Sequence, residues 1–185
     1  ITSFKDDENG NRVPCDGELW YRGYNVQNLI KSLSPDEFGF EKTAYLLLFG
    51  QMPTPEEEKE FAGVLGKSRT LPSNFTRDVI MKAPSKDIMN SMTRSILTLA
   101  SYDDLTSDSS VANNIRQCIN LIATFPMLAV YGYQAYNHYE NDQSMYIHRP
   151  DPKLSTAENF LRMLRADNKY TQLEARVLDV ALMLH

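Results

Sequence analysis

The chain has 185 residues and a formal net charge of −5, and 42% of its residues are hydrophobic while 23% are charged. This balance is ordinary for a folded protein and excludes an intrinsically disordered chain. An acidic chain with scattered lysines and arginines binds polyphosphates poorly, so we expect no nucleic-acid partner. The longest apolar runs, such as residues 44–49, are too short to cross a bilayer, so we expect no membrane partner.

The start of the chain and its cysteines bear on the cellular compartment. Residues 1–8 become polar after a short start and contain no apolar core of a signal peptide. Cys15 and Cys118 lie far apart and match no metal-binding or redox spacing. Two cysteines alone do not indicate a disulfide scaffold, which favours a reducing compartment. We therefore predict a cytoplasmic protein without a metal site.

The first predicted elements are short β-strands in residues 1–24. Asn9-Gly10 and Asp16-Gly17 are both turn signals of the kind found in hairpins, and apolar residues flank them. We therefore predict a short β-hairpin over residues 1–24 as the first segment. From Asn25 onward the apolar pattern becomes helical, so residues 25–185 form the second segment.

Several helices are predicted from their start signals and apolar faces. Capping boxes begin at Thr54, Ser155 and Thr171, each with a glutamate three residues later. Further helical stretches cover residues 41–49, 88–99 and 111–139, the last with a break or kink near Pro126. No long alternating strand is visible after the first segment. The sequence therefore predicts a mainly α fold.

The last helix, residues 174–185, shows an unusual ending. It stops without a glycine, a proline or a polar tail, so we expect this chain to be part of a longer one. Its apolar residues fall on or near one side, which we expect to pack against a partner. They are Leu173, Val177, Val180, Ala181 and Leu184.

The histidines give no clear catalytic signal by themselves. Tyr133, Tyr136 and Tyr139 share a helix face around His138, which we interpret as a packing or subunit-contact stripe, with Gly132 allowing close approach of a partner. His148 stands before a proline turn, which favours a solvated or loop-pinning histidine over a catalytic one. Motifs for zinc proteases, serine hydrolases and phosphate loops are absent.

Four longer strings resemble segments of the citrate synthase family. They are GELWYRGYNV at residues 17–26, FEKTAYLLLFG at 40–50, LSTAENFLRML at 154–164 and LDVALMLH at 178–185. The strings follow the family's order at compatible spacing and span nearly the whole chain. The resemblance implies a mainly α, citrate-synthase-like large helical domain, present in part, with a short N-terminal β-hairpin. Residues 25–185 would be the helical part of that domain, in the N-terminal half of a family member and ending before its small domain.

The resemblance also indicates which site residues the chain contains. His185 matches the first histidine of the family's LHAxH string, whereas the second, which belongs to the oxaloacetate pocket, would follow the last residue. His185 is therefore the single candidate substrate-binding residue, and no residue matches a catalytic role. Residues 83–89 depart from the family's His-Pro-Met-Asp string, so no role is carried over to them.

The activity implied by the resemblance is that of an acyltransferase of the tricarboxylic acid cycle. An aspartate removes a proton from the methyl group of acetyl-CoA, histidines stabilise the enolate and polarise the ketone of oxaloacetate, and citryl-CoA is hydrolysed to citrate and CoA. No cofactor is implied, since acetyl-CoA is a substrate, and family members form homodimers. We expect the chain alone to be inactive. The alternatives are a 2-methylcitrate synthase that uses propionyl-CoA and a non-catalytic dimerisation module of the same fold.

Overall fold

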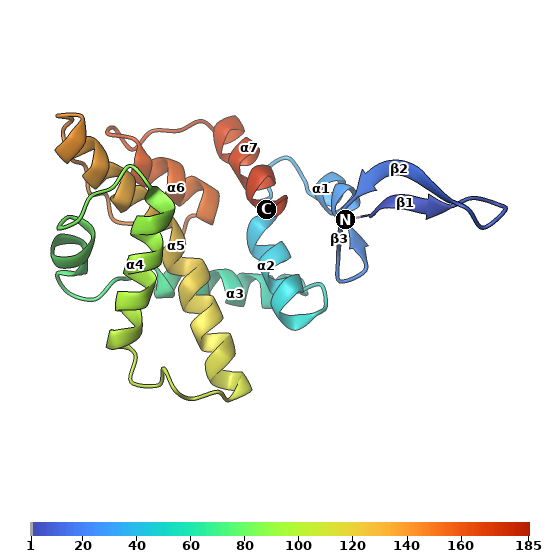
Figure 1. Cartoon of the computed structure of the whole chain (residues 1–185), viewed down its shortest axis with the longest axis horizontal. Coiled ribbons are helices and arrows are strands. Elements are labelled where there is room, and N and C mark those ends of the chain that lie inside the picture. The colour runs from blue at the N-terminus through green and yellow to red at the C-terminus, as the bar shows by residue number, and fades with distance from the viewer. Residues whose placement is uncertain (1) are drawn as a thin grey trace.

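A computed structural model describes residues 2–185 as a body of helices with two small β-hairpins at the N-terminal end (Figure 1). The strands are β1 (Thr2–Asp6), β2 (Arg12–Glu18), β3 (Trp20–Tyr21) and β4 (Tyr24–Asn25). The helices are α1 (Val26–Ser32), α2 (Phe40–Phe49), α3 (Pro55–Ser68), α4 (Ile88–Leu99), α5 (Val111–Glu140), α6 (Thr156–Leu164) and α7 (Gln172–Met183), with a π-helical turn η1 (Thr76–Ile80) and a 3-10 turn η2 (Ala100–Tyr102). The predicted mainly α fold class is confirmed.

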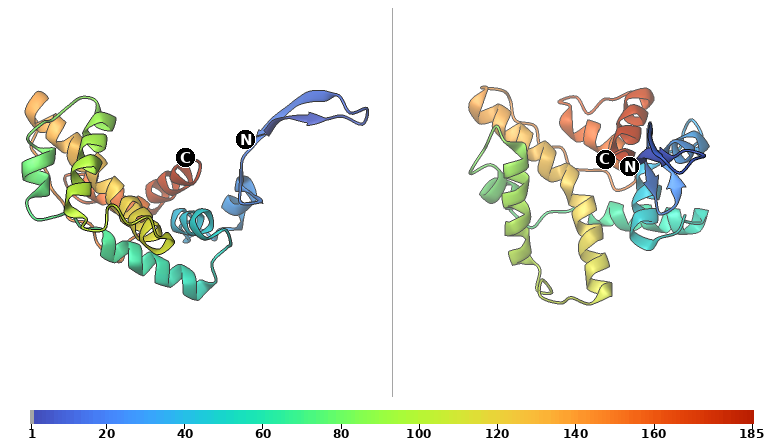
Figure 2. Two further views of the ribbon diagram at one scale, coloured as in Figure 1. Left: turned by 60° about the horizontal axis from the view of Figure 1, so that its bottom comes forward. Right: turned by 45° about the vertical axis from the view of Figure 1, so that its right-hand side comes forward.

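The first hairpin forms an arm that projects from the helical body (Figure 2). Strands β1 and β2 pair antiparallel, with Lys5 opposite Val13. The turn between them is the one predicted at Asn9-Gly10, and the Asp7 carboxylate closes it by accepting the N–H of Asn9 at 2.9 Å. An isolated pair of strands is only marginally stable in water, so this arm depends on its local turn and side-chain contacts.

The second turn lies elsewhere than the sequence suggested. Asp16-Gly17 was expected to be a turn, but this expectation is wrong, because both residues lie inside β2. The chain instead reverses at Arg22-Gly23, where both residues have positive φ, 50° and 88°, as a two-residue hairpin turn of type I′ requires. This turn pairs Tyr21 with Tyr24. Asn25 then caps α1 by accepting the N–H of Gln27 at 2.9 Å.

The three predicted capping boxes are present at the starts of α3, α6 and α7. In each box the Ser or Thr side chain accepts the backbone N–H three residues on, and the glutamate there accepts the N–H of the cap residue. Helix α2 differs, because its N-cap residue Gly39 offers no side chain for capping. Its first amides must therefore find acceptors elsewhere in the fold.

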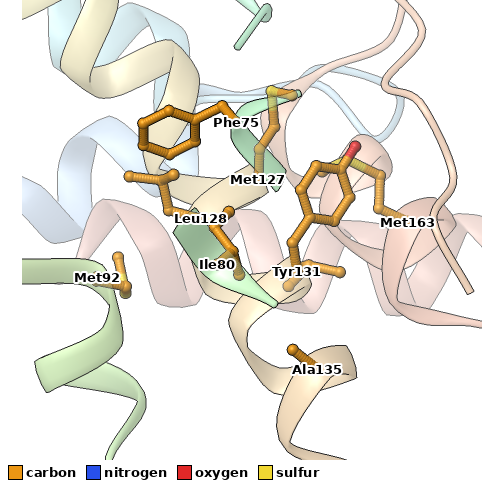
Figure 3. Packing of buried hydrophobic residues seen from close by; sticks show 9 residues of the cluster. Phe75, Ile80, Met92, Met127, Leu128, Tyr131, Ala135 and Met163 are labelled. Atoms are coloured by element: carbon orange, nitrogen blue, oxygen red, sulfur yellow. The ribbon is translucent and has the colours of Figure 1, made fainter. Parts of the chain in front are cut away.

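The long helix α5 organises the main core. It continues through Pro126 as one helix and changes direction along its length (Figure 2), so the predicted break is absent while the chain does bend. One side of α5 packs against α4, η1 and α6, and Figure 3 shows Tyr131 beside Met163 in this cluster. The buried members are Phe75, Ile80, Met92, Met127, Leu128, Val130, Tyr131, Ala135 and Met163. Full burial of each large apolar side chain contributes about 1.5–3 kcal/mol.

Two smaller clusters connect the remaining helices. One joins α2, α3 and α5 through Ala44, Phe61, Leu65 and Ala123. The other joins α1, α2 and α7 through Leu29, Leu46 and Met183. None of the helices in residues 2–185 has the length and apolar character that a bilayer crossing requires.

Candidate functional site

The candidate residue His185 lies directly after the last turn of α7. Helix α7 ends at Met183, whose side chain is buried against Leu29 of α1 and Leu46 of α2. His185 itself is exposed. The turn of α7 that precedes this imidazole is packed into the helical body.

The end of α7 is attached to the β3–β4 hairpin. The Tyr21 hydroxyl donates a hydrogen bond of 2.8 Å to the backbone carbonyl of Met183, across 162 residues of sequence. Met183 is the last residue of the helix, so its carbonyl has no N–H donor within the helix. The neighbouring Arg22 donates a 3.1 Å hydrogen bond to the carbonyl of Leu47, so the hairpin also contacts the end of α2.

The same helix is attached to the start of α2. The Asp179 carboxylate is fully buried and accepts the N–H of Gly39 at 2.8 Å and that of Phe40 at 3.1 Å. Burial raises the pKa of Asp179 above its usual range, while the two backbone hydrogen bonds oppose that rise. Asp179 thus supplies the cap that Gly39 cannot.

A second group of buried polar residues joins α2, α3 and α6. Glu41 accepts both the amide and the hydroxyl of Thr156, at 2.7 and 2.8 Å, and the Arg69 guanidinium lies 3.5 Å from the same carboxylate oxygen. Arg69 also donates to the carbonyl of Leu154 at 2.5 Å and to the Thr156 hydroxyl at 3.2 Å. Burial is the main influence on Glu41 and raises its pKa. We call Glu41, Arg69 and Thr156 the buried ion network.

The other two histidines hold loops rather than forming a site. The Nε2 atom of His148 lies 3.1 Å from the carbonyl of Ala166, while the Tyr131 hydroxyl donates to the His148 carbonyl at 2.9 Å. Of the two interpretations offered for His148, a solvated residue or one that pins a loop, the structure supports the second. His138 is exposed, and its Nδ1 lies 2.9 Å from the carbonyl of Gln143.

The tyrosine face of α5 is only partly available to a partner. Tyr133 and Tyr139 are exposed. Gly132, however, is buried, and a Cβ there would lie 3.6 Å from Ser91 of α4. The expectation that Gly132 allows a partner to approach is therefore wrong, because this glycine is buried within the chain beside α4, where a Cβ would make only an ordinary contact.

The chemical capacity of these groups is limited. Within residues 2–185, no three His, Cys, Asp or Glu side chains come together in a way that could hold a metal ion. The buried carboxylates Glu41 and Asp179 face backbone amides, a hydroxyl and the Arg69 guanidinium, which are structural partners. Two grooves of about 600 and 760 Å³ flank α5, and His185 lines neither of them.

Sequence reasoning missed Tyr21 and Asp179, although α7 contained a signal. Ala175, Asp179 and Met183 are the buried residues of this helix and follow one another at a spacing of four. An aspartate in the middle of a buried helix face must find donors in the fold. That pattern indicates a structural carboxylate even before its partners are known.

Comparisons with known proteins agree on one family. A family model described as "Citrate synthase, C-terminal domain" matches residues 2–185. The citrate synthase of Corynebacterium glutamicum is 28% identical over 174 residues, which are 91% of this chain and 37% of that protein. The 2-methylcitrate synthase of Shewanella oneidensis is 26% identical over 171 residues, which are 90% of this chain and 41% of that protein.

A solved structure shows the same fold. The crystal structure of citrate synthase from Pyrobaculum aerophilum superposes with a TM-score of 0.73 at 24% identity, over 91% of this chain and 41% of that one. The chain therefore spans about two fifths of the length of the relatives it matches. The matching model is described as a C-terminal domain, whereas the sequence strings suggested the N-terminal half. The position of the chain within a family-length protein stays a prediction.

Proposed function

Because the chain belongs to the citrate synthase family, we propose that it forms part of an acyltransferase that condenses acetyl-CoA with oxaloacetate to give citrate and CoA. The observation that carries this proposal is the family match, which extends over residues 2–185. In the proposal, residues 25–185 form the helical part of the large domain and residues 1–24 precede it as a hairpin segment. The enzyme is a cytoplasmic homodimer that needs no cofactor.

The proposal gives His185 a place at the border of the oxaloacetate pocket. The position of His185 directly after α7, whose last turn is packed against α1 and α2, supports this role. The catalytic aspartate and histidines come from parts of the protein outside these 185 residues. This division fits the local chemistry, because Glu41 and Asp179 are already engaged as buried hydrogen-bond acceptors.

The proposed dimer is supported by uncovered apolar surface. On α7, Leu173 and Val177 are 73% and 62% exposed, and they lie one helical turn apart on the same face as Ala181 and Leu184. Exposed apolar side chains at this spacing offer a surface on which a partner could pack. A two-fold dimer is the commonest solution for a chain that associates with itself.

The test begins with the reading frame that contains this sequence. We expect the frame to continue past His185 with further histidines, and its product to release CoA from acetyl-CoA only when oxaloacetate is present. Replacing acetyl-CoA by propionyl-CoA in the same assay tests 2-methylcitrate formation. A stop codon directly after His185 would contradict the enzyme proposal and support a non-catalytic module.

A further inference from the structure

Helix α7 is held at two points on one face. Asp179 and Met183 are four residues apart, so they lie one above the other on the helix surface. Asp179 binds the amides at the start of α2, and the Met183 carbonyl binds the Tyr21 hydroxyl of β3. The two attachments come from different elements and act on neighbouring turns of α7.

Close packing reinforces both attachments. A Cβ built on Gly39 would lie 2.5 Å from the sulfur of Met183 and from a methyl carbon of Leu33, so only a glycine fits there without movement. The Met183 side chain therefore packs directly against the residue whose amide Asp179 binds. The chain at this point leaves little space for the last turn of α7 to shift.

The Tyr21 hydrogen bond acts where a helix is weakest. The last turn of any helix has carbonyls without internal partners, and it frays for that reason. Tyr21 satisfies the carbonyl of the final helical residue, Met183. The backbone N–H of Leu184 still bonds back to Val180 at 3.3 Å, so helical geometry extends up to the residue before His185.

We propose that Tyr21 and Asp179 are positioning residues that form a latch on α7, and that this latch sets where His185 is placed. The inference rests on the proposed function, since only there does His185 border an oxaloacetate pocket. The latch consists of the Tyr21–Met183 hydrogen bond and the two hydrogen bonds from Asp179 to the start of α2. Neither residue contacts substrate in this proposal.

The experiment uses the 185-residue chain with labelled histidines and backbone amides, observed by NMR. Tyr21→Phe removes only the hydroxyl that binds the Met183 carbonyl. We expect the His185 resonances to shift, and amides in the last turn of α7 to exchange about fivefold faster, the factor that corresponds to the typical net contribution of one hydrogen bond. Asp179→Asn leaves a single acceptor oxygen on the side chain, so only one of the two amides of Gly39 and Phe40 can keep its hydrogen bond. We expect the other amide to exchange faster than in the parent.

The matched control is Tyr131→Phe. Tyr131 likewise donates its hydroxyl to a backbone carbonyl, at 2.9 Å, but the carbonyl belongs to His148. We expect this variant to shift the His148 resonances and to leave those of His185 unchanged, with Tyr21→Phe showing the reverse. A residue that merely contributed to overall stability would affect both histidines alike.

Two results would overturn the latch. One is a Tyr21→Phe chain whose His185 resonances and amide exchange match those of the parent. The other is a chain in which both Tyr→Phe variants shift the three histidines equally. These measurements involve no catalysis, so they are independent of the proposed function. If the NMR results show the latch but the product of the complete reading frame has no activity, the proposed function is refuted and the latch is not.

Discussion

Two glycines of α3, three residues apart, should respond to alanine in opposite directions. A Cβ at Gly66 would lie 2.2 Å from the carbonyl oxygen of Pro152, whereas a Cβ at Gly63 would meet no atom within 4 Å. The Pro152 backbone cannot easily yield, because Arg69 binds the Leu154 carbonyl at 2.5 Å and Asn159 binds the Asp151 carbonyl at 2.9 Å. Gly66→Ala must therefore push α3 away from the turn before α6.

The magnitudes follow from two general effects. Overpacking of a tight contact costs about 1–3 kcal/mol, and replacing glycine by alanine inside a helix gains about 0.5–1 kcal/mol. We expect Gly66→Ala to lose about 2 kcal/mol of unfolding free energy and Gly63→Ala to gain about 0.5–1 kcal/mol. Urea unfolding followed by helical circular dichroism measures both. If Gly66→Ala stabilises the chain as Gly63→Ala does, the close approach of α3 to Pro152 is wrong.

Three further predictions concern the buried ion network and the apolar face of α7. Arg69→Met leaves the Glu41 carboxylate buried beside an apolar chain, so urea unfolding should show a loss of about 3–5 kcal/mol; a loss below about 1 kcal/mol would contradict the network. Glu41 has a folded pKa raised above its ordinary value of 4.5, so its contribution favours folding below pH 4.5 and is lost as the pH rises through the folded pKa. We therefore expect the free energy of unfolding of Glu41→Gln, relative to that of the parent, to increase as the pH rises. The opposite trend would refute the raised pKa. Light scattering across a dilution series should show the chain associating at micromolar concentration and a Leu173→Lys, Val177→Lys chain shifted towards monomer; a strictly monomeric parent would refute the dimer.

Local signals in the sequence predicted most of the helical architecture. Each capping box places its acceptor within three residues of the N–H that it binds. The helix starts at Thr54, Ser155 and Thr171 can therefore be predicted from the local sequence, without knowledge of the fold. The two dipeptides Asn9-Gly10 and Asp16-Gly17 are equally strong turn signals in the sequence, although only the first forms a turn. Pairing of Thr2 with Glu18 extends β2 through Asp16-Gly17, and only that pairing decides which dipeptide turns.

The attachments around the candidate site depend on partners far away in sequence. Thr156 binds Glu41, which lies 115 residues away in the sequence. Asp179 caps α2 from a distance of 140 residues, and Tyr21 binds the carbonyl of Met183 from a distance of 162 residues. No helix period or turn rule contains such pairings, because they arise only when packing brings the elements together. The strings that resemble the family did include Glu41 and Asp179, but the resemblance alone did not reveal their structural task.

We propose that these 185 residues supply structure and a border of the substrate pocket, while the catalytic groups lie outside them. A thiol-release assay on the purified 185-residue chain, with acetyl-CoA and oxaloacetate, tests it most directly. We expect CoA release no faster than in a sample without protein. Turnover comparable to that of an intact citrate synthase would contradict it, because the base and the enolate-stabilising groups would then have to lie within these residues.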